Sequence, residues 1–134
     1  MVESEMEMGF RTFEDLETYK AARAFRVRIY ELARQLPEQE KYNLASQMRR
    51  AATSLTNCIA EGHGRYHYQE TIQFLRQSRG SLQELIDDLN ICLDERYAEP
   101  EDLNEMKEEG YVVLRTLNGY IKYLRHCKEE NDHD

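Results

Sequence analysis

Five polar residues recur at steps of three and four between residues 47 and 61, within "QMRRAATSLTNCIAEGHGR". Gln47, Arg50, Ser54, Asn57 and Glu61 would form one continuous strip on a helix, beside an apolar stripe; we name this strip the polar ribbon. Its hydroxyl, carboxylate and amide groups are of the kind that perform hydrolysis. Activation of Ser54 would need a neighbouring base, and the predicted helix supplies no histidine. The ribbon therefore does not predict catalysis.

Two other interpretations of the polar ribbon are a solvent-exposed face and a contact between subunits. Solvated faces favour long Lys and Glu side chains, whereas this ribbon is largely short and rich in amides. Such side chains suit a partly buried contact in which each polar group has a fixed partner. We therefore favour a subunit interface formed by Gln47, Arg50, Ser54, Asn57 and Glu61.

A second cluster, Glu61, His63, His67 and Glu70, surrounds a turn and could suggest a metal site. The two glycines of the turn break the helix that would align the imidazoles, and no cysteine or aspartate joins the cluster. Histidine metal sites need better-organised ligands than these. We predict solvent-facing histidines, no metal and no cofactor.

Basic and aromatic residues interleave in the middle of the chain, where residues 23–79 hold ten bases and five acids. Arginines beside aromatic rings can bind the phosphates and unpaired bases of RNA. The alternative is pairing with the fifteen acids of residues 80–134, within or between subunits, and we rank it just ahead. The candidate RNA or partner contacts are Arg49, Arg65, Arg76, Arg79, Tyr66 and Tyr68, while Arg50 belongs to the polar ribbon.

Four amphipathic patterns must position these residues. Apolar residues at three- and four-residue steps predict helices from near Asp15 to Leu36, from between Pro37 and Asn43 to Gly62, from His67 to about Arg96, and from Pro100 to Leu124. Short connections make an all-α, antiparallel up-down-up-down four-helix bundle the simplest architecture. The predicted organisation is a flexible acidic leader over residues 1–12, the bundle over 13–127 and a polar tail over 128–134.

Glycines punctuate these patterns. Gly62 is expected to be the left-handed residue that ends the second helix. Gly80 lies midway along the third helix, so either the helix bends there or another backbone packs closely; Gly110 and Gly119 raise the same question in the fourth. We expect close packing and include Gly80 in the candidate subunit interface.

Composition bounds the class of protein. A chain of 134 residues with 40% apolar and 33% charged residues suits one globular domain. No apolar stretch approaches the roughly 20 residues that span a bilayer, and the N-terminus does not resemble a signal peptide. Three cysteines without a Cys-x-x-Cys motif indicate a reduced, cytoplasmic protein. The net charge of −8 argues against general nucleic-acid affinity.

Five segments occur in a fixed order: "FEDLETYKAA" (Phe13–Ala22), "LPEQEKYNLASQMRRAATS" (Leu36–Ser54), "IAEGHGR" (Ile59–Arg65), "FLRQSRGSLQEL" (Phe74–Leu85) and "LNGYIKYLR" (Leu117–Arg125). Together they resemble one family, the bacterial 23S rRNA intervening-sequence proteins, which are four-helix bundles. The resemblance implies an antiparallel bundle that assembles into a homopentamer, and association with RNA or a ribonucleoprotein. A related branch serves as accessory proteins of diversity-generating retroelements, which bind a reverse transcriptase.

The sequence departs from the family pattern at three positions. Thr56 stands where proline is common, Cys58 where asparagine is common, and His67 where a serine would cap the third helix. The last change predicts a less well-capped helix.

The function expected from the sequence is that of a non-enzymatic oligomeric scaffold associated with RNA or a ribonucleoprotein. The alternatives are a purely protein-binding assembly and an accessory subunit of a reverse-transcriptase system. A di-iron bundle enzyme would need two Glu-x-x-His motifs, whereas the chain has one, from Glu130 to His133. We expect no membrane contact and identify no small-molecule substrate.

Overall fold

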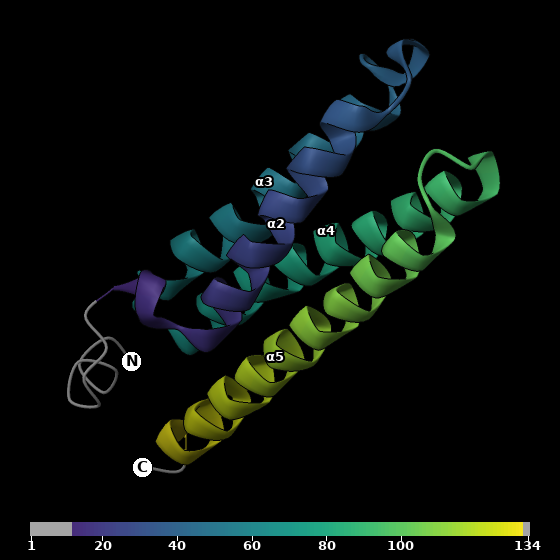
Figure 1. The fold of residues 1–134 in the computed structure, drawn as a ribbon. Helices are drawn as coiled ribbons and strands as arrows, with labels where there is room; N and C mark the ends of the chain where they lie inside the picture. The colour runs from purple at the N-terminus through teal and green to yellow at the C-terminus, as the bar shows by residue number, and fades with distance from the viewer. Residues whose placement is uncertain (1–11, 133–134) are drawn as a thin grey trace.

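A computed structural model describes residues 12–132, which form four long α-helices and two short 3₁₀ turns. The all-α class and the four-helix fold are thus confirmed, whereas residues 1–11 of the predicted leader lie outside the described residues. Figure 1 shows the helices packed side by side, with the start of the coloured chain and the end of α5 at the same end of the bundle. The elements are η1 (Phe13–Asp15), α2 (Glu17–Gln35), η2 (Glu38–Glu40), α3 (Leu44–His63), α4 (Tyr68–Glu95) and α5 (Pro100–Asp132).

Cross-helix contacts show that each neighbouring pair of helices is antiparallel. Arg26 and Tyr30 of α2 contact Thr56 and Thr53 of α3, in reverse order. The Thr71 hydroxyl of α4 donates to the Gly62 carbonyl of α3, and the Ser78 hydroxyl donates to the earlier Leu55 carbonyl. Arg79 of α4 contacts Asn118 of α5, and Gln69 contacts Lys128. Thr116 of α5 contacts Thr18 of α2, which closes the bundle.

The apolar stripes of the four helices meet in one core, as the periodicity predicts. Each helix contributes fully buried side chains, among them Phe25, Met48, Leu82 and Leu117. Four stripes that face one axis remove apolar surface from water on every helix, and this burial is the dominant favourable term in folding. The core fixes the rotation of each helix and therefore the direction of its polar side chains.

The helix ends follow from local sequence. The Thr12 hydroxyl accepts from the Glu14 N–H, and the Asp15 carboxylate accepts from the Thr12 N–H, which caps η1. Pro100 begins α5, as predicted. His67 precedes α4 without a side-chain capping bond, in agreement with the expected weaker cap.

The role predicted for Gly62 is wrong. The helix continues past Gly62 to His63, and Gly62 does not adopt the left-handed conformation. A Cβ on Gly62 would lie 2.8 Å from the Cβ of Phe74 in α4. Gly62 is therefore required by the close approach of α3 and α4.

The mid-helix glycines of α4 and α5 differ from one another. A Cβ on Gly110 would lie 3.1 Å from Ile86 and 3.3 Å from Phe25, so this glycine does pack closely. Gly80 and Gly119 would meet nothing within 4 Å. Close packing of Gly80 within the chain is therefore wrong, because its position points away from the core; a contact with another subunit stays a prediction.

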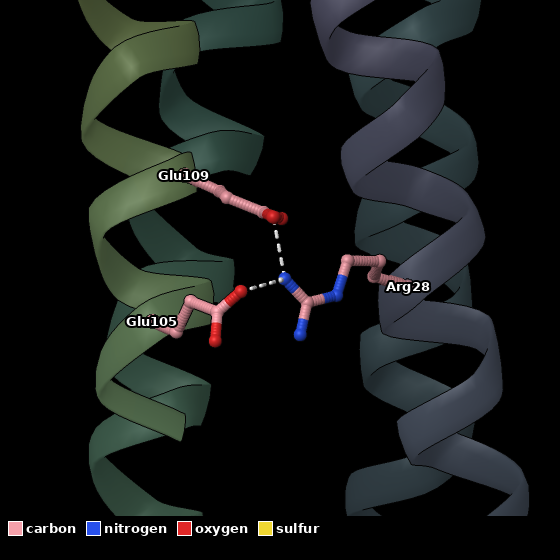
Figure 2. Close-up of polar contacts among 3 residues, drawn as sticks. All are labelled: Arg28, Glu105 and Glu109. Atoms are coloured by element: carbon pink, nitrogen blue, oxygen red, sulfur yellow. Dashed lines mark hydrogen bonds and ion pairs between the residues drawn. The ribbon is translucent and has the colours of Figure 1, made fainter. Parts of the chain in front are cut away.

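An ion pair ties the first helix to the last. Arg28 of α2 lies between Glu105 and Glu109 of α5, and its guanidinium contacts both carboxylates (Figure 2). All three side chains are partly exposed, so the pair contributes specificity of docking more than stability.

The α5 helix extends beyond residue 127, the predicted end of the bundle domain. Residues 128–132, assigned to a polar tail, continue the helix as far as Asp132. Two contacts support this extension: Lys128 donates to Gln69 of α4 at 2.9 Å, and His126 lies 3.1 Å from Glu130. Polar residues can thus extend a helix whose other end is packed in the bundle.

We predict opposite effects of alanine at two helical glycines. Gly62→Ala places a methyl group against Phe74 and should lower the free energy of unfolding by about 1–3 kcal/mol. Gly119→Ala, the matched control, enters open space within a helix and should raise it by about 0.4–1 kcal/mol. Urea denaturation followed by circular dichroism measures both. Equal stability of the two variants would contradict the close approach at Gly62.

Candidate functional site

The polar ribbon lies along α3, with its side chains directed away from the core. Gln47, Arg50, Asn57 and Glu61 are exposed, while Ser54 is half-buried. Among residues 12–132, no hydrogen bond or ion pair engages the four exposed side chains. The structure thus brings the ribbon together on one face of α3, as the spacing predicts.

Two open grooves flank the ribbon. The larger, of about 540 Å³, lies toward α2 and is lined by residues that include Tyr30, Arg49, Arg50 and Asn57. The second, of about 490 Å³, lies toward α4 and is lined by Gln47, Arg50, Ser81 and others. Arg50 and Ser54 line both grooves and therefore lie on the ridge between them. Side chains of a second molecule could enter on either side of this ridge.

The ribbon's serine is engaged within the bundle. The Ser81 hydroxyl lies 3.0 Å from the Ser54 hydroxyl, and the Cys58 sulfur lies 3.7 Å from it. The nearest histidine of the same helix is His63, nine positions further along; α3 includes it because the helix runs past Gly62. Nine residues correspond to about 13 Å along the axis, too far for a base to reach a serine.

Thr56, one of the departures from the family pattern, has a defined role in the contact between α2 and α3. Its side chain is buried and accepts a hydrogen bond from Arg26 at 2.8 Å. Beside it, the hydroxyls of Tyr30 and Thr53 share a hydrogen bond. The buried hydroxyl is therefore paired, as a polar group in a core must be. Cys58, the second departure, is half-buried and lies 3.9 Å from Gln77.

The predicted RNA-contact residues do not form one surface. Arg49 lies in the second turn of α3, where its guanidinium reaches the Lys41 carbonyl. Arg65 follows the opposite end of α3 and stacks on the Phe74 ring at 4.7 Å. Arg76 and Arg79 belong to α4. Along the axis of α3, sixteen residues from Arg49 to Arg65 correspond to roughly 24 Å, which separates the candidates.

The two tyrosines of the set also differ. Tyr66 is 86% exposed and packs edge-on against His67. Tyr68 is partly buried against the core. Tyr66 is therefore the one of the pair that is free to stack on a base.

Intramolecular pairing of these arginines with carboxylates is not observed in the described part of the chain. Arg79 donates to the Asn118 amide oxygen at 2.9 Å, and Arg76 has no ion pair there. Within residues 12–132, the acids that pair with arginine are Glu105 and Glu109, and their partner is Arg28. Pairing between subunits stays a prediction.

The turn between α3 and α4 does not assemble a metal site. Within residues 12–132, no three His, Cys, Asp or Glu side chains are grouped so that they could hold a metal ion. Glu61, His67 and Glu70 are exposed, and His63 is half-buried at the end of α3.

Sequence reasoning missed a group of cations in the second half of α5. Arg115, Lys122, Arg125 and Lys128 occur in residues 111–128, which contain no acid. Residues 80–134 as a whole are strongly acidic, and this average concealed the segment. The signal available in the sequence was the absence of Asp and Glu from eighteen successive residues.

Two carboxyl groups are held in unusual environments. The Tyr97 hydroxyl donates to Glu40 at 2.7 Å, which lowers the pKa of Glu40 and raises that of Tyr97. Asp88 of α4 is 4% exposed, and its Oδ2 has no hydrogen-bond partner. Burial, reinforced by Glu84 and Asp87, raises the pKa of Asp88 to about 7.

We predict that Asp88 makes the bundle less stable as the pH rises. The unfolded chain releases this proton near pH 4 and the folded chain near pH 7. Between these values the unfolded state is favoured by ionisation of Asp88, so the free energy of unfolding falls as the pH rises. Asp88→Asn removes the charge at every pH and should gain stability relative to the wild type across this window, reaching about 1–3 kcal/mol at pH 8. Urea denaturation from pH 4 to pH 8 measures the difference. A difference that is constant with pH would refute the assignment.

No described helix is long and apolar enough to cross a membrane. The family model for the 23S rRNA-intervening sequence protein matches residues 14–119. A crystal structure from Bacteroides thetaiotaomicron, of a protein with unknown function from the S23 ribosomal protein family, superposes with a TM-score of 0.72. It shares 21% sequence identity, and the match covers 78% of this chain and 95% of that one, which shows the common fold. No curated protein matches the sequence. The chain therefore belongs to the 23S rRNA-intervening sequence protein family.

Proposed function

We propose that this protein is a non-enzymatic, self-associating helical bundle that serves as a scaffold for RNA or a ribonucleoprotein. The observation that carries the proposal is the polar ribbon of α3. Four of its side chains are exposed and make no hydrogen bond within residues 12–132, and two grooves flank them. A neighbouring subunit would supply partners for the amide, guanidinium and carboxylate groups and fill the grooves.

The distribution of charge suggests which surface meets the ribbon. At the end of the bundle away from the termini, residues 26–53 of α2 and α3 carry six bases and three acids. Residues 84–109, from α4 through the start of α5, carry eleven acids and two bases. The basic region of one subunit would thus meet the acidic region of the next. Such a head-to-tail contact uses two different surfaces and gives a ring when the rotation from one subunit to the next closes.

A ring of five subunits is what the family resemblance implies. The ribbon would lie at each subunit contact, with Arg50 inserted between residues of the neighbour and Gly80 exposed for close approach by another backbone. The proposed assembly stays in the cytoplasm and needs no cofactor.

The second candidate is an assembly that binds only protein, for example as an accessory subunit of a reverse-transcriptase system. The observation that favours it is the net charge of −8, because a polyanion such as RNA is repelled by a net negative protein. RNA binding by the wild type separates the two candidates.

We predict that the wild type is an oligomer and that Arg50→Glu disperses it. Light scattering at micromolar concentration should give about five times the 16.0 kDa chain mass for the wild type. Arg50→Glu places a carboxylate opposite the acidic surface of the neighbouring subunit. Such a pair of like charges at an interface typically weakens association by several kcal/mol. The variant should therefore give a lower mass.

Arg23→Glu is the matched control, because Arg23 is exposed on α2 and lines neither groove. It makes the same change of charge and should keep the wild-type mass. A monomeric wild type would show that the polar ribbon is a solvent-exposed face and would refute the assembly. An equal loss of mass in both variants would assign the effect to net charge and not to the ribbon.

A further inference from the structure

Charge is segregated along the hairpin of α4 and α5. Residues 71–83 of α4 and 111–128 of α5 contain six arginines and lysines and no acid, whereas residues 84–109 between them contain eleven acids and two bases. Glu70, Glu129, Glu130 and Asp132 lie beyond these segments at the very end of the two helices, so the hairpin is positive over the half nearer the chain termini and negative toward its connecting turn.

The two acid-free segments lie side by side. Arg79 donates to Asn118 at 2.9 Å, and Lys128 donates to Gln69 at 2.9 Å, so the helices are in contact along this whole length (Figure 1). Tyr111, Arg115, Asn118, Lys122 and Arg125 recur at steps of three and four residues and thus share the flank of α5 that borders α4. On α4, the matching flank carries Arg76, Arg79 and Gln83. We name the cationic face by its five charges: Arg76, Arg79, Arg115, Lys122 and Arg125.

Within residues 12–132, the cations of this face have no carboxylate as a counter-ion. None of the five makes an ion pair with a described carboxylate, and Arg79 contacts a neutral amide oxygen. From Arg115 to Arg125 the helix rises about 15 Å. Five like charges over this length repel one another, and a partner with a row of negative charges would relieve the repulsion.

The shape of the cationic face favours a polymer over a small ligand. Gly119, which follows Asn118 in the sequence, has no atom within 4 Å of an added Cβ, so the surface is low at this point. Small-molecule sites are concave, and the two large grooves lie along α3 instead. Guanidinium groups bind phosphates with two parallel hydrogen bonds, and Tyr111, 45% exposed, offers a ring for stacking.

We propose that the cationic face binds the phosphate backbone of an RNA strand, an inference that rests on the proposed RNA association and places it on a surface separate from the polar ribbon. The acidic turn end of the hairpin repels the strand and confines it to the half of the bundle near the termini. This arrangement reconciles local RNA binding with a net charge of −8, because the Debye length of about 8 Å at physiological salt screens the distant acids.

The test compares two pairs of charge-neutralising substitutions. Arg115→Gln with Lys122→Gln removes two exposed cations from the face, and Lys20→Gln with Arg23→Gln removes two exposed cations from α2, outside the basic region of residues 26–53. Each double variant loses the same charge, and glutamine favours helix about as well as the residues replaced. The probe is a fluorescein-labelled oligouridine of about 20 nucleotides, titrated by anisotropy from about 50 to 200 mM salt.

We expect the wild type to bind at the lower salt and the face variant to bind roughly tenfold more weakly. The slope of log affinity against log salt should fall in magnitude by about 1.4 for two lost phosphate contacts on a single strand. The α2 variant should stay within about twofold of the wild type. Arg76→Gln with Arg125→Gln, a second variant of the face, should reproduce the loss.

Three results would overturn the proposal. Equal losses in the face and α2 variants would mean that only net charge matters. Competition by polyglutamate as strong as that by RNA of equal charge would identify an acidic polypeptide as the partner. Absence of binding by the wild type at about 50 mM salt would exclude an RNA surface. Light scattering of the same samples measures the oligomer mass separately. A failure of RNA binding by the cationic face can therefore be distinguished from a failure of the proposed assembly.

Discussion

The close approach of α3 and α4 is the constraint on which the rest of the structure depends. Gly62 leaves room for Phe74, and the hydroxyls of Thr71 and Ser78 donate to the Gly62 and Leu55 carbonyls at 2.9 and 2.6 Å. Bonds from buried side chains to the backbone of another helix fix both rotation and register, because a slip of one residue would move each hydroxyl away from its acceptor carbonyl in α3. With the rotation of α3 fixed, the polar ribbon can face only outward, between α2 and α4.

The same constraint explains why the chain can carry so polar a helix. Ala51, Ala52 and Leu55 supply the core side of α3, and the partner helices cover them closely. A helix with small core side chains packs at a shorter interaxial distance from its neighbours. A narrower part of its surface is then buried in the core. The remaining circumference is available for Gln47, Arg50, Asn57 and Glu61, none of which the bundle itself requires. A face that folding leaves unused is where an interaction can be placed without loss of stability.

Helix positions and core residues could be predicted from the sequence because both depend on local periodicity. Every apolar residue of the α3 stripe is buried, and Pro37 and Pro100 mark helix boundaries correctly. The glycines could not be assigned in this way. Gly62, Gly80, Gly110 and Gly119 all lie inside helices, yet their surroundings range from a 2.8 Å approach to open space. What distinguishes them is the neighbouring helix, and sequence spacing within one helix carries no information about it.

The candidate site shows a similar division between local and distant information. Spacing along α3 is sufficient to collect the polar ribbon, because its members are neighbours on one helix. The cationic face joins residues about forty positions apart, such as Arg79 and Lys122, which come together only when α4 and α5 pair through contacts such as that of Arg79 with Asn118. Counting charge along the chain placed Arg115 and Lys122 in an acidic block, whereas the fold places them beside Arg76 and Arg79, far from most of the acids of that block. For a bundle whose charges are segregated by end, net charge therefore says little about which partners a given face can bind.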